Sequence, residues 1–127
     1  MVNFMNLTET MINIIKKYKI QTFGIFGSRA RGDFREDSDY DIFIISDGLS
    51  IKDEFEIESI LEKELNNNID LIKLNKRTDK ILLKNILNDA VVLYNENNEY
   101  EKLYNYIDNF FIENHDFIKL RERELLD

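Results

Sequence analysis

Two aspartates, Asp39 and Asp41, stand two residues apart just before a hydrocarbon run at residues 42–45. Aromatic and β-branched residues around them predict a strand, on which residues two apart project from the same face. Two carboxylates held so close together repel each other unless a cation lies between them. Mg²⁺ commonly binds one or two protein carboxylates together with the phosphates of a substrate. The pair therefore predicts a Mg²⁺ site mounted on a rigid strand.

A third aspartate, Asp70, has a matching position near the start of the next predicted strand, residues 69–74. A helix expected over residues 51–65 joins the two strands, and a helical crossover favours parallel pairing. Because parallel neighbours bring their starts together, we expect Asp70 beside Asp39 and Asp41. Three carboxylates that hold two Mg²⁺ ions are a known arrangement for phosphoryl and nucleotidyl transfer.

A glycine–serine turn, Gly27-Ser28, follows a predicted first strand over residues 20–26. Gly27 lets the backbone approach a phosphate closely, and Ser28 opens a short helix whose free N–H groups favour an anion. If the first two strands run antiparallel, this turn lies beside the carboxylates. Arg29 and Arg31 add local positive charge. The segment predicts a phosphate-binding turn next to the metal site.

The elements that must hold these residues alternate between helix and strand. A first helix is expected after Asn6 or Thr8 and extends to about residue 18. The remaining helices are expected over residues 51–65, 78–88 and 99–124, and the strands over residues 20–26, 39–45, 69–74 and 90–94. This order predicts an α/β (α+β) class, with a small mixed sheet of about four strands flanked by helices.

Each long helix has an apolar stripe that is expected to face the core. The residues predicted to point inward are Phe55, Ile57, Ile60, Leu61 and Leu65, then Ile81, Leu82, Ile86 and Leu87, and finally Tyr100, Leu103, Tyr104, Ile107, Phe110, Phe111 and Ile118.

Length and composition limit the class of protein. The 127 residues suit one domain, with a core over about residues 5–95 and a C-terminal helix over about 99–124. The absence of cysteine excludes disulfides and thiolate metal sites. No membrane-spanning run or signal peptide is recognised, so a cytoplasmic protein without a membrane partner is expected. A net charge of −8 argues against direct binding of duplex nucleic acid.

The segment Gly27-Ser28-Arg29-Ala30-Arg31-Gly32, followed by Ser38-Asp39-Tyr40-Asp41-Ile42, resembles the signature of the polymerase-β-like nucleotidyltransferase superfamily. In size and motif the chain is most similar to the minimal nucleotidyltransferase (MNT) domain proteins, over about residues 5–95. The resemblance implies the polymerase-β-like nucleotidyltransferase fold, ATP as the donor and Mg²⁺ as the cofactor. It also implies that Gly27 and Ser28 lie at the triphosphate and that Asp39, Asp41 and Asp70 bind the metal.

MNT proteins resembling this one commonly act as antitoxins of HEPN-domain RNase toxins and add AMP to a tyrosine of the toxin. The resemblance therefore implies Mg²⁺-dependent transfer of AMP from ATP to a tyrosine hydroxyl of a HEPN partner. The acidic charge suits binding of a ribonuclease whose own surface attracts RNA.

Two alternatives for the function remain open. One is a non-catalytic module that silences its partner by occlusion. The other is nucleotidyl transfer to a small molecule such as an aminoglycoside, with the acceptor site completed by a second copy of the chain. The length leaves room for the catalytic core and one terminal helix, so a further acceptor-binding domain is not expected.

Overall fold

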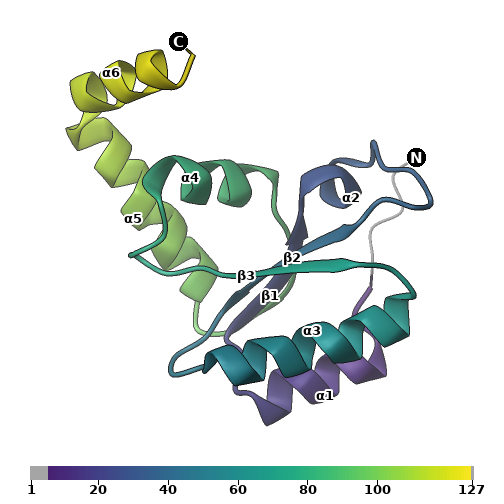
Figure 1. Ribbon diagram of the computed structural model, residues 1–127. Coiled ribbons are helices and arrows are strands. Elements are labelled where there is room, and N and C mark those ends of the chain that lie inside the picture. Colours follow the sequence, from purple (N-terminus) through teal and green to yellow (C-terminus); the bar gives the residue numbers. More distant parts are fainter. Residues whose placement is uncertain (1–5, 127) are drawn as a thin grey trace.

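The computed structural model describes residues 6–126, apart from the side chains of residues 117, 118, 122, 125 and 126. Its centre is one sheet, shown in Figure 1, with the strand order β3-β2-β1-β4. The strands are β1 (Thr22–Phe26), β2 (Tyr40–Ile45), β3 (Ile69–Lys73) and β4 (Val91–Asn95). β1 pairs antiparallel with both β2 and β4, whereas β2 and β3 are parallel. The predicted mixed sheet of four strands is confirmed.

The described part of the chain has six helices, several of which have clear N-terminal caps; the last one extends from the helix before it, away from the sheet (Figure 1). They are α1 (Glu9–Lys17), α2 (Gly27–Arg31), α3 (Ile51–Leu65), α4 (Lys80–Asp89), α5 (Glu99–Glu113) and α6 (His115–Leu126). The Thr8 hydroxyl accepts from the backbone of α1, which decides between the two caps expected for that helix. Ser50 and Asp53 form a reciprocal capping box at the start of α3.

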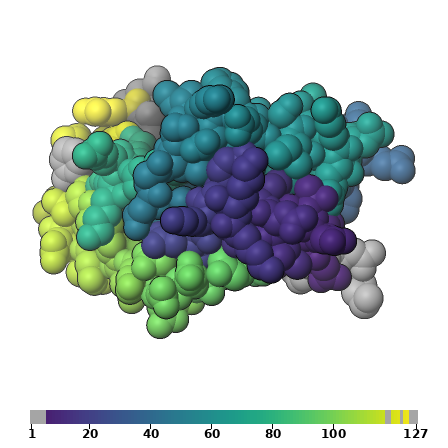
Figure 2. Space-filling model, turned by 90° about the horizontal axis from the view of Figure 1, so that it is seen from below, coloured from purple at the N-terminus to yellow at the C-terminus, as the bar shows by residue number. Residues whose placement is uncertain are grey.

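The helices cover the sheet in two layers, and a separate apolar core lies under each. α1 and α3 lie on one face, side by side in both views of the molecule (Figures 1 and 2). Their core contains Met11, Ile14, Ile42, Ile57 and Leu61. α4 and α5 cover the other face, over a core that contains Phe43, Leu83, Ile86, Leu87, Leu103 and Ile107. The alternation of β2 thus sends its even residues toward α1 and α3 and its odd residues toward α4 and α5.

Several helical positions differ from the expected stripes. Phe55 is 66% exposed and Ile60 lies at the surface, because the inward row of α3 is formed by Ile57, Leu61 and the partly buried Leu65. On α4 the buried row is Leu83, Ile86 and Leu87, so Leu83 replaces Leu82, which is exposed. The prediction was wrong at Phe55, Ile60 and Leu82.

Several elements also begin or end at other residues than expected: β2 begins at Tyr40 and not at Asp39, and α4 extends over Lys80–Asp89 and not over residues 78–88. The first strand begins at Thr22, two residues later than expected, after a turn in which Lys19 has a positive φ of 54°. The single helix expected over residues 99–124 is two helices, because the helical conformation is interrupted at Asn114. The side chain of Ile118 lies outside the described residues. Within residues 6–126, no helix combines the length and apolar character needed to cross a membrane.

Candidate active site

The starts of β2 and β3 bring two of the three aspartates side by side. Asp41 and Asp70 are direct register partners in the parallel pair, and Tyr40 pairs with Ile69 in the same way. Asp39 precedes the first residue of β2 and is exposed. Both strands therefore begin at one edge of the sheet, as the helical crossover predicts, and all three carboxylates belong to that edge.

The electrostatics of Asp41 show how crowded this edge is with negative charge. Burial raises the pKa of the Asp41 carboxyl, and the charges of Asp70 and Asp39 raise it further. The charge of Arg31 acts on the Asp41 carboxyl in the opposite sense and lowers its pKa. The folded chain therefore keeps a partly buried carboxylate in a field that disfavours its charge, which a bound cation would relieve.

Gly27 lies directly against the Asp41 carboxylate. It follows Phe26, the register partner of Asp41 at the end of β1. Its φ is +72°, and a Cβ added there would lie 2.2 Å from Oδ2 of Asp41. Glycine is thus required at this position for its backbone conformation and for the space beside the carboxylate. Ser28 is the next residue of α2, so both residues of the predicted phosphate-binding turn lie at the carboxylate edge.

The donor set of this edge fits a hard divalent cation. The described side chains contain no group of three histidines, aspartates or glutamates that already converges on one metal position. Mg²⁺ does not need such a group, because it commonly binds one or two carboxylates and completes its shell with water and substrate phosphates. Asp41 and Asp70 supply adjacent carboxylates, exposed Asp39 can turn toward them, and the absent side chain of Gly27 leaves space beside Asp41.

Arg31 lies on the same side of the sheet as Asp41 and is held by two acidic residues. Its Nη1 donates to Asp89 at 3.1 Å, and its Nε donates to Asp33 at 3.3 Å. The guanidinium is about half exposed, and an arriving phosphate has access to it. Asp89 ends α4 just before β4, so its place at the site depends on the pairing of β4 with β1. Nothing in the local sequence indicates this contact.

Arg29 lies away from the carboxylates. Its Nη2 donates to the carbonyl oxygens of Glu36 at 3.1 Å and Ser38 at 2.9 Å. Its guanidinium carbon lies 4.1 Å from the centre of the Tyr40 ring. Because Tyr40 projects from the opposite face of β2 to Asp41, Arg29 is on the other side of the strand. The structure brings the glycine, the aspartates and Arg31 to one edge and leaves Arg29 outside this group.

One further acidic residue near the site was not expected from the sequence. Burial raises the pKa of Glu58 on α3, and the charges of Glu62 and Asp70 add to that effect. In the sequence Glu58 is one of many acidic residues on α3, and only the packing of α3 on β3 distinguishes it.

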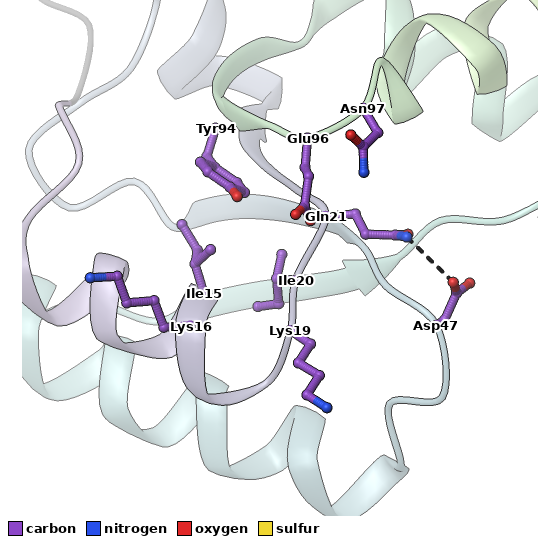
Figure 3. A pocket seen from close by; sticks show the side chains of 9 residues that line it. All are labelled: Ile15, Lys16, Lys19, Ile20, Gln21, Asp47, Tyr94, Glu96 and Asn97. Atoms are coloured by element: carbon purple, nitrogen blue, oxygen red, sulfur yellow. Dashed lines mark hydrogen bonds between the residues drawn. The ribbon is translucent and has the colours of Figure 1, made fainter.

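A cavity of about 600 Å³ lies at the opposite end of the sheet, near Gln21, the residue before β1. Figure 3 shows its lining, in which Lys16 and Lys19 share the wall with Asp47 and Glu96. Gln21 donates a hydrogen bond to Asp47 across part of its mouth, at 3.3 Å. Its mixed charges favour no particular ligand, and none of the predicted site residues lines it.

Comparison with known proteins assigns the chain to a family. The family model described as "Polymerase beta, Nucleotidyltransferase" matches residues 9–99. The chain belongs to this family. A relative from Methanocaldococcus jannaschii, named "Putative protein adenylyltransferase", is 32% identical over 90 residues, which cover 70% of this chain and 96% of the relative. The predicted nucleotidyltransferase is confirmed.

Solved structures of MNT-type nucleotidyltransferases share the fold. One is a chain of a toxin–antitoxin structure with AMP-PNP, with a TM-score of 0.77 and 17% identity over 93% of this chain and 97% of the other. Another comes from the tri-AMPylated HEPN toxin of Shewanella oneidensis in complex with its MNT antitoxin. Its TM-score is 0.70, with 16% identity over 92% of this chain and 93% of the other. At these identities the likeness concerns the fold.

Proposed function

We propose that this nucleotidyltransferase moves AMP from ATP to a tyrosine hydroxyl of a partner HEPN-domain RNase toxin and thereby acts as its antitoxin. The observation that supports catalysis most directly is the register of Asp41 with Asp70 beside Gly27. A chain that only occluded a partner would not need paired carboxylates that disfavour one another's charge.

Each residue of the edge has a role in the proposed reaction. Asp39, Asp41 and Asp70 bind Mg²⁺ through carboxylate oxygens, and the turn at Gly27 and Ser28 receives the triphosphate. Arg31, already exposed and close to Asp41, neutralises phosphate charge. Mg²⁺, when bound, would polarise the α-phosphate and stabilise the pyrophosphate that leaves.

The bond changes follow from this arrangement. The tyrosine oxygen forms a bond to the α-phosphorus, the bond between that phosphorus and pyrophosphate breaks, and the tyrosine proton passes to a carboxylate. Asp70 is the proposed acceptor of that proton, since it stands on the outer strand β3 of the sheet.

Three observations support a HEPN toxin as the acceptor. The relatives in sequence are named as protein adenylyltransferases, which favours a protein over a small molecule. The structural neighbours include an MNT antitoxin solved with an AMP-modified HEPN toxin. The net charge of −8 adds a physical reason, because a ribonuclease that attracts RNA also attracts an acidic protein. A cytoplasmic location is part of the same proposal.

The test is incubation of the chain with α-labelled ATP, Mg²⁺ and the protein encoded by the adjacent gene. Label is expected on a tyrosine of that neighbour, together with loss of its RNase activity. The double variant Asp39→Ala/Asp41→Ala should lose both labelling and neutralisation. The variant Asp47→Ala, which removes an exposed carboxylate at the other end of β2, should keep both. Neutralisation that persists without label, or in the double variant, would establish occlusion instead.

A further inference from the structure

Arg29 is buried beneath the loop that leads into the carboxylate edge. Only 9% of its surface is exposed, although an arginine side chain is seldom buried unless its charge is paired. Its guanidinium carbon lies 4.3 Å from the ring centre of Phe34 and 4.1 Å from that of Tyr40. Arg29 is therefore covered by aromatic rings on the far side of β2, away from the place where a phosphate at Gly27 would bind.

The contacts of Arg29 are concentrated on the backbone around Asp39. Nη2 donates to the carbonyl oxygen of Ser38, the residue directly before Asp39, and to that of Glu36. The ring of Tyr40, the residue directly after Asp39, packs on the same guanidinium. Arg29 thus contacts the chain on both sides of Asp39 without touching its carboxylate. These contacts fix the backbone from which an otherwise exposed side chain projects.

Arginine suits this place for physical reasons that lysine does not share. Its guanidinium is planar and weakly hydrated, so it packs flat on aromatic rings while its N–H groups still donate. Its Nε is buried without a hydrogen-bond partner in the described structure, which shows that close packing outweighs complete pairing here. A lysine ammonium would keep the charge but lose the flat contact with both rings.

We propose that Arg29 is a positioning residue, which holds the segment 34–40 so that Asp39 stays at the carboxylate edge. This rests on the proposed function only for the role of Asp39 as a metal ligand. The part of the proposal that Arg29 restrains the segment 34–40 does not depend on any catalytic activity.

The test uses the full chain with three single substitutions. Arg29→Lys keeps the charge, Arg29→Met keeps an apolar stem, and Tyr40→Phe is the matched control that keeps the ring. Trypsin cleavage after the exposed Arg35 measures loosening of the loop under native conditions. Cleavage is expected to be about tenfold faster in both Arg29 variants, because buried hydrogen bonds from a charged donor are lost. In Tyr40→Phe it should match the wild type.

Binding of Mn²⁺ in the presence of AMP-PNP, followed by electron paramagnetic resonance, measures the effect on the metal site. Mn²⁺ affinity is expected to fall about tenfold in both Arg29 variants, within the range for residues that orient metal ligands. Circular dichroism at the assay temperature verifies folding, and Phe34→Leu gives a milder loosening should either Arg29 variant fail to fold.

The outcomes distinguish this proposal from the alternative that Arg29 binds a phosphate. If Arg29 were a phosphate ligand, Arg29→Lys would behave like the wild type and Arg29→Met would weaken AMP-PNP binding without faster cleavage. That result would overturn the proposal, as would faster cleavage with unchanged Mn²⁺ affinity. Failure of the proposed transfer reaction would leave the cleavage measurement intact, so the two can fail separately.

Discussion

Asp41 and Asp70 occupy the same register position on the parallel strands β2 and β3, although helix α3 separates them in the chain. The Cα partners of a parallel pair are neighbours across the sheet, so their side chains leave one face next to each other. Two carboxylates become neighbours here only through correct strand pairing. The acidic edge is therefore a product of the tertiary fold, and the charge repulsion within it has a cost in stability.

Replacing Asp70 should remove transfer without unfolding the protein. Asp70 is exposed, so Asp70→Asn removes one charge and little packing. Loss of a metal-binding carboxylate is expected to slow AMP transfer about a hundredfold or more. Asp47→Asn, at the opposite end of the sheet, is the matched control and should transfer at the wild-type rate. The measurement is initial rate with labelled ATP at saturating Mg²⁺; equal rates in the two variants would contradict a role for Asp70.

Asp41→Asn should stabilise the metal-free protein at neutral pH. Because the folded state raises the pKa of Asp41, it binds that proton more tightly than the unfolded chain does. The stability that this provides is present below the ordinary pKa of an aspartate and is lost as the pH rises through the raised value. Neutral asparagine avoids that loss, so thermal unfolding at pH 7 in EDTA should shift upward by roughly 1–3 °C.

Two further conditions check the same reasoning. At a pH below the ordinary aspartate range, the wild type and Asp41→Asn should unfold at nearly the same temperature, since Asp41 is then protonated in both states. Addition of Mg²⁺ with AMP-PNP should raise the unfolding temperature of the wild type more than that of the variant. A variant that is less stable than the wild type in EDTA at pH 7 would refute the assigned charge repulsion.

Gly27→Ala should damage both stability and activity. Its Cβ would lie 2.2 Å from Oδ2 of Asp41, and its φ of +72° is unfavourable for alanine. Gly48→Ala is a close control, because Gly48 has a φ of +74° and no atom within 4 Å of an added Cβ. Both variants should lose about 1 kcal/mol from backbone strain, but only Gly27→Ala should also lose AMP transfer. Equal transfer rates would show that Asp41 can move without consequence.

Much of the fold and the carboxylate edge could be predicted because their signals are local. The hydrocarbon run after Asp41 and the helical pattern of residues 51–65 establish the elements, and the crossover then requires parallel pairing. The positions of Asp41 and Asp70 follow from those two facts. The turn at Gly27 is similarly local, since a glycine at a strand end is visible in sequence.

The rest depends on contacts that no local pattern encodes. Arg29 and Arg31 carry the same charge and are two residues apart in the sequence. They lie on opposite sides of β2, because residues two apart on the helix α2 project in different directions. Phe55 has the hydrophobicity of a core residue, but it lies outside the row of Ile57, Leu61 and Leu65 that faces the core and is 66% exposed. Asp89 meets Arg31 only after β4 has paired with β1. These features are decided by tertiary packing.

The pair of Arg31 and Asp89 offers a last test of which charges act on the nucleotide. If Arg31 neutralises the triphosphate, Arg31→Met should lower kcat/KM for ATP about a hundredfold, as for other preorganised donors to a developing charge. Asp89→Asn removes one of two acidic partners from a half-exposed guanidinium, and exposed ion pairs contribute little. It should change kcat/KM by less than about fivefold. Steady-state kinetics of both variants decide the matter, and a loss in Asp89→Asn as large as that in Arg31→Met would mean that Asp89 itself takes part in transfer.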